Sequence, residues 1–253
     1  MRSRRYGIFR MHAIIFLAAA FGLQPSRAHA GPPQILTVAN FSAARAGGPL
    51  PNGWQPLVFP KIKRHTRYTL VKDGNTTVIR AVSRRSASAL IRIVRIDPGV
   101  YPILNWRWKI ARVNVKGDVH RRGGDDYAAR IFIFFSDPDS KTGILKEAGS
   151  RVTGLTHAKT LSGKCLNYIW ANKTPAGTVV VSPYSGRFMM IAVESGNQQA
   201  GRWVEEHRNL FEDFERAFGT PPPPVAAVAI MTDTDDTGQS AVGYFGDIAF
   251  SRR

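Results

Sequence analysis

Carboxylates are concentrated in one short stretch near the C-terminal end of the chain. Residues 233–238 read Asp-Thr-Asp-Asp-Thr-Gly, so three carboxylates lie within four residues ahead of a glycine. A hard cation such as Ca²⁺ binds closely spaced carboxylate oxygens, and glycine allows the sharp turn that brings them together. We therefore predict Asp233, Asp235 and Asp236 as calcium ligands. The alternative is a turn in which Asp and Thr side chains cap backbone N–H groups, since no glutamate stands at the twelfth loop position.

A second acidic pair precedes an arginine. Asp125 and Asp126 follow two glycines and lead into an apolar run that carries Arg130. An arginine on an apolar strand needs a carboxylate partner, so this spacing is typical of a buried ion pair. The alternative makes Asp125 or Asp126 a catalytic acid or base, opposite Asp233 or Asp235. Such a polysaccharide hydrolase or lyase would require carboxyl groups roughly 5–10 Å apart across an open groove.

Aromatic and basic side chains supply a third set of candidates. Exposed aromatic rings stack on sugar rings, while Asp, Asn and Arg side chains hydrogen-bond to the hydroxyls. The predicted ligand-binding residues are Trp106, Arg130, Tyr168, Trp170, Trp203 and Arg208. Core packing is the alternative for the rings, because aromatic residues on strands are usually buried. We expect Trp203, which stands in a polar segment, to be the most exposed of them.

Other catalytic chemistries lack the residues that they need. The histidines show neither an HExxH nor a His-x-His spacing, so a zinc site is not expected. The sequence contains no G-x-S-x-G motif, phosphate-binding loop or dinucleotide fingerprint. Its single cysteine, Cys165, has no adjacent basic residue to activate it and excludes a disulfide scaffold. Apart from calcium, we expect no cofactor.

The first thirty residues have the three regions of a secretory signal peptide. Four arginines precede an apolar run at 13–23, and the Ala-His-Ala sequence at 28–30 fits a cleavage site. We predict removal of residues 1–30 and export to the periplasm or the medium. The mature chain, 31–253, is then expected to carry no transmembrane segment.

The chain is strongly basic, with 35 Lys and Arg residues, 18 Asp and Glu residues and a formal net charge of +17. Removal of residues 1–30 would take away five arginines and no acid, leaving +12. An exported protein meets no genome, so we expect an acidic or neutral glycan rather than nucleic acid as the partner of a monomer. The basic residues are dispersed, so the alternative is that they serve solubility alone.

The mature chain alternates between strand-forming runs and turns. β-Branched and aromatic residues dominate ten runs, at 35–41, 66–71, 76–82, 87–96, 104–110, 127–135, 166–171, 188–193, 225–231 and 241–250. This spacing predicts one mainly all-β domain, an antiparallel β-sandwich of the jelly-roll type. Apolar residues at helical spacing predict one amphipathic helix near 205–218, packed on the sandwich and ended by Gly219 and the prolines after it.

Six motifs extend along the mature chain. They are NWRWK at 105–109, GDDYAAR at 124–130, LNYIW at 166–170, WVEEHRN at 203–209, MTDTD at 231–235 and YFGDI at 244–248. Together they resemble the bacterial family named domain of unknown function 3047, over about 35–250 of this chain. The last two motifs also look similar to the closing strands of galactose-binding-like jelly rolls. That second resemblance implies a fold often used to bind carbohydrate, whereas the family itself has no assigned catalytic residues.

Two functions follow from these patterns. The one we favour is an exported, non-catalytic β-sandwich that binds a glycan or another polymer of the cell envelope. The alternative is the carboxylate-dependent hydrolase or lyase described above.

Overall fold

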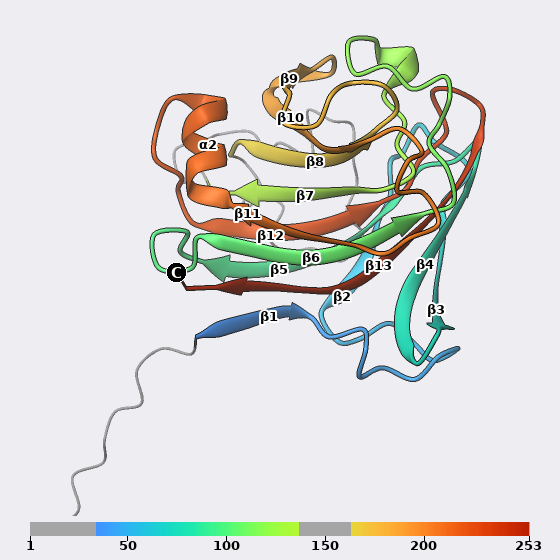
Figure 1. Cartoon of the computed structure of the whole chain (residues 1–253), viewed down its shortest axis with the longest axis horizontal. Coiled ribbons are helices and arrows are strands. Elements are labelled where there is room, and N and C mark those ends of the chain that lie inside the picture. The colour runs from blue at the N-terminus through green and yellow to red at the C-terminus, as the bar shows by residue number, and fades with distance from the viewer. Residues whose placement is uncertain (1–33, 137–162, 253) are drawn as a thin grey trace, which may run out of the picture. The chain divides into compact units, whose positions relative to one another are not determined.

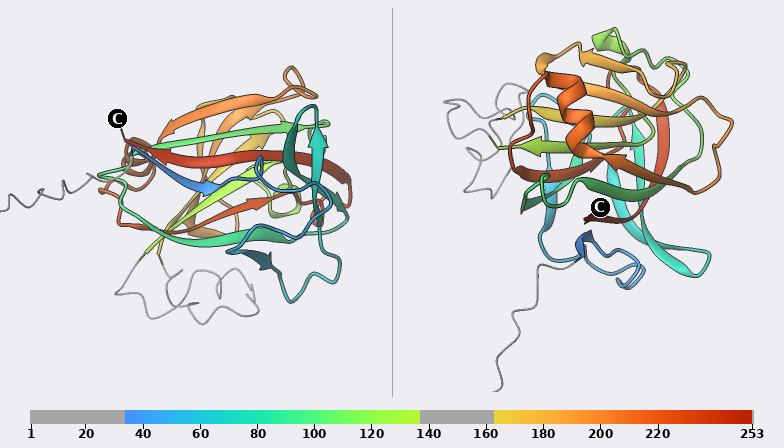
Figure 2. Two further views of the ribbon diagram at one scale, coloured as in Figure 1. Left: turned by 90° about the horizontal axis from the view of Figure 1, so that it is seen from below. Right: turned by 60° about the vertical axis from the view of Figure 1, so that its left-hand side comes forward.

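Two β-sheets make up most of the described chain, which comprises residues 34–136 and 163–252 of a computed structural model (Figure 1). The six-stranded sheet contains β1 (Ile35–Ala39), β3 (Arg67–Asp73), β4 (Thr76–Arg84), β6 (Ile103–Ile110), β11 (Val204–Asn209) and β13 (Ser240–Ser251). The seven-stranded sheet contains β2 (Trp54–Leu57), β5 (Ala89–Ile96), β7 (Arg130–Phe135), β8 (Cys165–Ala171), β9 (Val179–Ser182), β10 (Ser185–Ser195) and β12 (Val225–Met231). Figure 2 shows the sheets as two layers, so the predicted β-sandwich is confirmed.

Strand pairing is antiparallel at every described pair but one. The orders are β11-β6-β13-β4-β3, with β1 also on β13, and β2-β5-β12-β7-β8-β10-β9. Strand β10 runs antiparallel to β9 but parallel to β8. The predicted antiparallel sandwich thus contains one parallel pair, because the chain leaves β8, forms the edge strand β9 and returns as β10 between the two.

All ten predicted runs coincide with strands of the structure. The strands that the prediction missed are β2, β9 and β11. Strands β2 and β9 have only four residues each, too few for a hydrophobic period to be recognised. Strand β11 is mostly polar and was assigned to the start of the helix.

Alternating side chains on facing strands form the core between the sheets. On β6, Trp106 and Trp108 point inward and are buried, whereas Asn105, Arg107 and Lys109 point outward. The two inward indoles contact aromatic rings of β8 in the opposite sheet. The ring centroids of Trp106 and Tyr168 are 5.3 Å apart, and those of Trp108 and Trp170 are 5.8 Å apart. These ring pairs join the two layers near the middle of the core.

One helix, α2 (Leu210–Phe218), packs against the end of the sandwich. Asn209 begins it by accepting a hydrogen bond from the backbone N–H of Glu212, and Gly219 ends it with a positive φ of 70°. The ring of Phe214 is buried 4.4 Å from the ring of Phe135 at the end of β7. The predicted helix is confirmed over 210–218 but wrong over 205–209, where the chain pairs with β6 as β11.

No helix within 34–136 and 163–252 is long and apolar enough to cross a membrane. The predicted signal peptide, residues 1–30, lies outside the described residues, and its cleavage stays a prediction.

Candidate functional site

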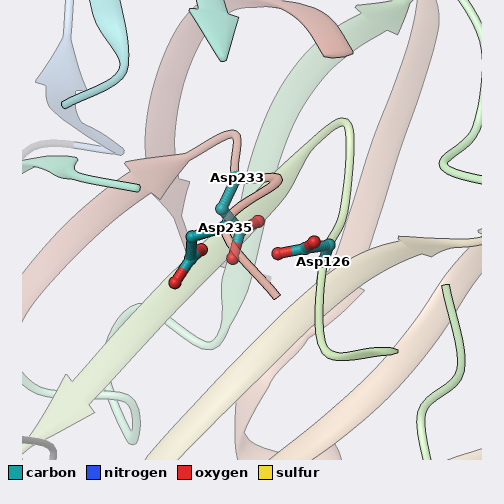
Figure 3. Close-up of side chains that lie close together, drawn as sticks. All are labelled: Asp126, Asp233 and Asp235. Atoms are coloured by element: carbon teal, nitrogen blue, oxygen red, sulfur yellow. The ribbon is translucent and has the colours of Figure 1, made fainter. Parts of the chain in front are cut away.

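The two acidic segments meet at one end of the seven-stranded sheet. Strand β7 begins where its antiparallel neighbour β12 ends, and Arg130 pairs in register with Met231. The residues just before β7 therefore lie beside those just after β12. Figure 3 shows the side chains of Asp126, Asp233 and Asp235 gathered from these two loops. One carboxylate oxygen from each lies within 4.8 Å of the others.

Arg130 lies beneath this acidic cluster, with only 5% of its surface exposed. Its guanidinium forms ion pairs with Asp233 and, at 3.4 Å, with Asp125. The same group lies 5.1 Å from the ring centroids of Tyr127 and Phe132. The predicted ion pair of Arg130 is thus present, but the prediction that Arg130 contacts a ligand is wrong, because its guanidinium is buried and already paired.

Backbone N–H groups hold the carboxylates in place. Asp126 accepts hydrogen bonds from the backbone N–H groups of Asp236, at 3.4 Å, and Thr237, at 2.5 Å. Asp233 accepts one from the N–H of Tyr127 at 3.1 Å. Each acidic loop therefore caps the other, which is the turn-capping role considered for these residues.

The electrostatics of the cluster favour neutralisation. Burial raises the pKa of Asp125 to about 6, although the charge of Arg130 opposes the shift. Burial, together with the charge of Asp126, raises the pKa of Asp235 to about 6. Burial also raises the pKa of Asp233 well above its usual range, despite its contact with Arg130. One guanidinium does not compensate so many carboxylates, so the site favours a bound proton or cation.

The predicted calcium ligands are only partly brought together. Asp233 and Asp235 belong to the cluster, but the carboxylate of Asp236 instead accepts a 2.6 Å hydrogen bond from the hydroxyl of Tyr184. Asp126 completes the cluster from the loop before β7. The Asp233–Gly238 spacing alone could not find this residue, because strand pairing rather than chain proximity places it there.

The acidic cluster does not meet the requirement of the hydrolase or lyase alternative. Asp126 has carboxylate oxygens within 4.8 Å of those of Asp233 and Asp235, and Asp125 shares Arg130 with Asp233. A catalytic pair would face across an open groove at roughly 5–10 Å, with space for the scissile bond between its members. Here the carboxylate of Asp126 is hydrogen-bonded to the loop after β12, and the carboxylate of Asp233 is hydrogen-bonded to Tyr127 before β7.

Most of the predicted stacking rings are core residues. Trp106, Tyr168 and Trp170 are 4%, 0% and 1% exposed. The prediction that they bind a sugar is wrong, because their rings fill the space between the sheets. Arg208, also predicted to bind a ligand, instead forms an ion pair with Asp213 of α2 and thereby links β11 to the helix.

Trp203 lies on the outer face of the six-stranded sheet and is partly exposed. The guanidinium of Arg107 lies 4.7 Å from its ring centroid, and its Nε1 donates a 2.8 Å hydrogen bond to Asp73. Lys109 also pairs with Asp73 and lies 4.5 Å from the ring of Tyr244. The predicted exposed ring is therefore part of a surface network of charges and aromatic groups.

A shallow hollow of about 250 Å³ adjoins this network. Its polar lining comes from the outward positions of β6, β11 and β13: Asn105, Arg107, Glu205, His207 and Asp247. Glu205 lies opposite Arg107 in register, and His207 lies opposite Asn105. The Arg107 side chain can lie across β13 because Gly246 has no side chain. A Cβ added to Gly246 would lie 2.5 Å from Cγ of Arg107.

Sequence reasoning identified Trp203, which adjoins this hollow through Arg107, and Trp106, which is among its lining residues although its ring is buried, but none of the polar lining residues. Alternation places the polar residues of the NWRWK motif on one side of its strand. In the WVEEHRN motif it places Glu205 and His207 on one side and Glu206 and Arg208 on the other. The pairing of β6 with β11, which puts the two polar rows side by side, appears only in the structure.

A family model described as "Protein of unknown function (DUF3047)" matches residues 52–249 of the chain. The chain belongs to this family. A comparison with curated proteins finds no match.

Three solved structures are similar to the chain at low identity. The family 11 carbohydrate-binding module of the cellulosomal cellulase Lic26A-Cel5E of Clostridium thermocellum is 8% identical, with 88% of this chain and 97% of that chain covered and a TM-score of 0.43. A mutant of the family 29 module CBM29-2 is 12% identical, with 87% and 92% covered and a TM-score of 0.32. The Emp47p carbohydrate recognition domain is 9% identical, with 85% and 94% covered and a TM-score of 0.38.

Proposed function

We propose that the protein is an exported, non-catalytic module that binds a glycan on the outer face of its six-stranded sheet. One observation carries this proposal. Arg107 and Glu205 lie opposite each other at the rim of a hollow, yet they form no ion pair with each other or with any other described residue. Their hydrogen-bonding groups are therefore available to a ligand.

The chemistry of the hollow suits sugar hydroxyls. A guanidinium offers five N–H donors and an ionised carboxylate only accepts, whereas a hydroxyl does both. Neighbouring hydroxyls of a sugar could thus bridge Arg107 and Glu205. His207 adds a ring nitrogen, because its Nδ1 is already hydrogen-bonded to Asn105 at 2.6 Å and its Nε2 is left for a ligand.

Trp203 positions the guanidinium. Its ring contacts the guanidinium of Arg107, and the missing side chain of Gly246 makes room for the Arg107 side chain. A group held in place in this way loses little conformational freedom when it binds.

The charge of the chain favours an acidic over a neutral glycan. The net charge of +17 would attract a polyanion, and the predicted removal of residues 1–30 leaves most of that charge in place. Export to the periplasm or the medium is part of the proposal and is supported by the signal-like pattern of those thirty residues.

Affinity electrophoresis through gels that contain acidic or neutral polysaccharides tests the proposal. We expect at least one polysaccharide to retard the wild-type protein. The variants Arg107→Met and Glu205→Gln should weaken that retardation by about tenfold, equivalent to about 1.4 kcal/mol of binding energy. Arg80→Met is the matched control, since Arg80 is an exposed arginine of the same sheet that does not line the hollow.

Two results would contradict the proposal. One is the absence of retardation by every polysaccharide tested. The other is equal retardation of the wild type and Arg107→Met, which would place any binding site elsewhere.

A further inference from the structure

The acidic cluster at the end of the seven-stranded sheet plays no part in the proposed glycan site. The carboxylates around it come from residues 125, 126, 233, 235 and 236, whereas Arg130 is the cation in ion-pair contact with it among the described residues. Asp126 and Asp235 form no ion pair with any residue that the structure describes. Carboxylates packed this closely without a compensating charge repel one another.

Asn114 provides an independent indication of a ligand. It is 3% exposed, and its Nδ2 donates a 3.0 Å hydrogen bond to the backbone carbonyl of Asp233. An added Cβ on Gly117 would meet the backbone carbonyls of both Asn114 and Asp126, at 2.9 and 3.2 Å. The Asn114 side chain thus reaches the backbone of the loop after β12, and Gly117, three residues further along, lies against the loop before β7. Among the described residues the buried Oδ1 of Asn114 has no hydrogen-bond donor, whereas a buried amide oxygen normally has a donor or a cation as its partner.

Thr237 adds a second buried oxygen without a partner. Its backbone N–H donates to Asp126, and its Oγ1 has no hydrogen-bond partner within the part of the chain that the structure describes. Two neutral oxygens and three carboxylates therefore lie around the same pair of loops.

We propose that Asp126, Asp233, Asp235 and Asn114 bind one divalent cation, and that this cation is Ca²⁺. Calcium takes six to eight oxygen ligands at about 2.3–2.6 Å, so two ligands on opposite sides of the ion lie about 5 Å apart. The 4.8 Å limit on the carboxylate oxygens is compatible with that spacing. Magnesium is less suited, because it requires a tight octahedron and retains several waters.

The carboxylates can coordinate the ion without losing their present contacts. Asp233 accepts from Tyr127 and Arg130, and Asp126 accepts from two backbone N–H groups. Each carboxylate oxygen has a further lone pair for a metal. The ion would join the loop before β7 to the loop after β12 and neutralise charge that Arg130 leaves uncompensated.

Isothermal titration calorimetry tests this site directly. Full-length protein is stripped with EDTA, dialysed, and titrated with CaCl₂ or MgCl₂, with its melting temperature recorded in parallel. We expect binding of one Ca²⁺ with a dissociation constant of about 1 mM or tighter, weaker binding of Mg²⁺ and a higher melting temperature with Ca²⁺. Asp235→Asn, which alters the least buried member of the cluster, should weaken Ca²⁺ binding by about tenfold or more.

The neighbouring carboxylate supplies a matched control. Asp236→Asn removes a charge next in sequence but outside the cluster, so it should change the affinity by less than about threefold. Asn114→Ala should weaken binding as well, and the melting temperature without metal shows whether that variant folds. The proposal is overturned if the folded wild type binds no Ca²⁺ up to about 10 mM. It is equally overturned if Asp235→Asn binds Ca²⁺ as tightly as the wild type.

Discussion

At the scale of single residues, burial raises the pKa of several acids. Glu206 on β11 points toward the core, and its carboxylate accepts a 3.1 Å hydrogen bond from Trp108. Burial, and secondly the negative charge of Glu194, raise the pKa of Glu206 to about 7. Its sequence neighbour Glu205 points outward into the hollow, so adjacent residues of one strand have different chemistry.

Glu206 should make stability depend on pH. In the unfolded chain its pKa returns to about 4.5, so between about 4.5 and 7 the folded state holds a proton that the unfolded state releases. Its contribution to stability is therefore full below pH 4.5 and is lost as the pH rises through 7. Glu206→Gln should stabilise the protein by about 1–3 kcal/mol at pH 8, and by little at pH 4.5.

Guanidinium denaturation of this variant and the wild type, at several pH values, measures the difference. Glu205→Gln is the control, because it makes the same substitution at the neighbouring position of the strand, where the side chain points outward. A Glu206→Gln advantage that is independent of pH would exclude the proposed protonation.

At the scale of elements, capping decides where β11 ends and α2 begins. Asn209 is the last residue of β11 and the N-cap of α2, where its side chain accepts from the N–H of Glu212. Residues 204–208 still pair with β6, so the helical period of the apolar residues applies only from Leu210 onward. Asp213, inside the first turn, accepts hydrogen bonds from Tyr168 and Arg208 and so fastens the helix to both sheets.

Removal of the cap should destabilise this junction. Asn209→Ala leaves the N–H of Glu212 without its acceptor and should lower the free energy of unfolding by about 1 kcal/mol. Asn209→Ser retains an accepting oxygen for the N–H of Glu212 and a donor for the Glu212 carboxylate, so it should remain close to the wild type. Chemical denaturation followed by circular dichroism distinguishes them, and equal stability of the Ala and Ser variants would contradict a capping role.

At the scale of the whole molecule, the sheets approach closely where β13 passes the acidic end of the sandwich. Gly243 on β13 lies against the carbonyl of Ala128, before β7, and an added Cβ would also meet Oγ1 of Thr232, after β12, at 2.7 Å. Thr232 itself donates a 2.8 Å hydrogen bond to Ala128. This contact joins the six-stranded sheet to the loops that form the acidic cluster.

A single methyl group should disturb that junction. Gly243→Ala places its Cβ against rigid backbone and should destabilise the fold by about 1–3 kcal/mol or more. Gly186→Ala is the matched control, because Gly186 is also a strand glycine but has no atom within 4 Å of an added Cβ. Thermal unfolding compares the two, and an equal melting temperature for both variants would show that the junction can relax.

The sequence alone predicts which side chains of a strand share a face, because successive side chains of a strand point to opposite faces. Alternation located ten strands and the two-faced pattern of β6, and helical spacing located the helix expected near 205–218, of which 210–218 is present. Alternation could not show which face of β6 points inward. The indole ring of Trp106, predicted to bind a sugar, is therefore a core residue in the structure. Only the pairing of β7 with β12 and of β6 with β11 brought Asp126 to Asp233 and Arg107 to Glu205. Contacts between residues so far apart in the chain depend on strand order, which local periodicity does not encode.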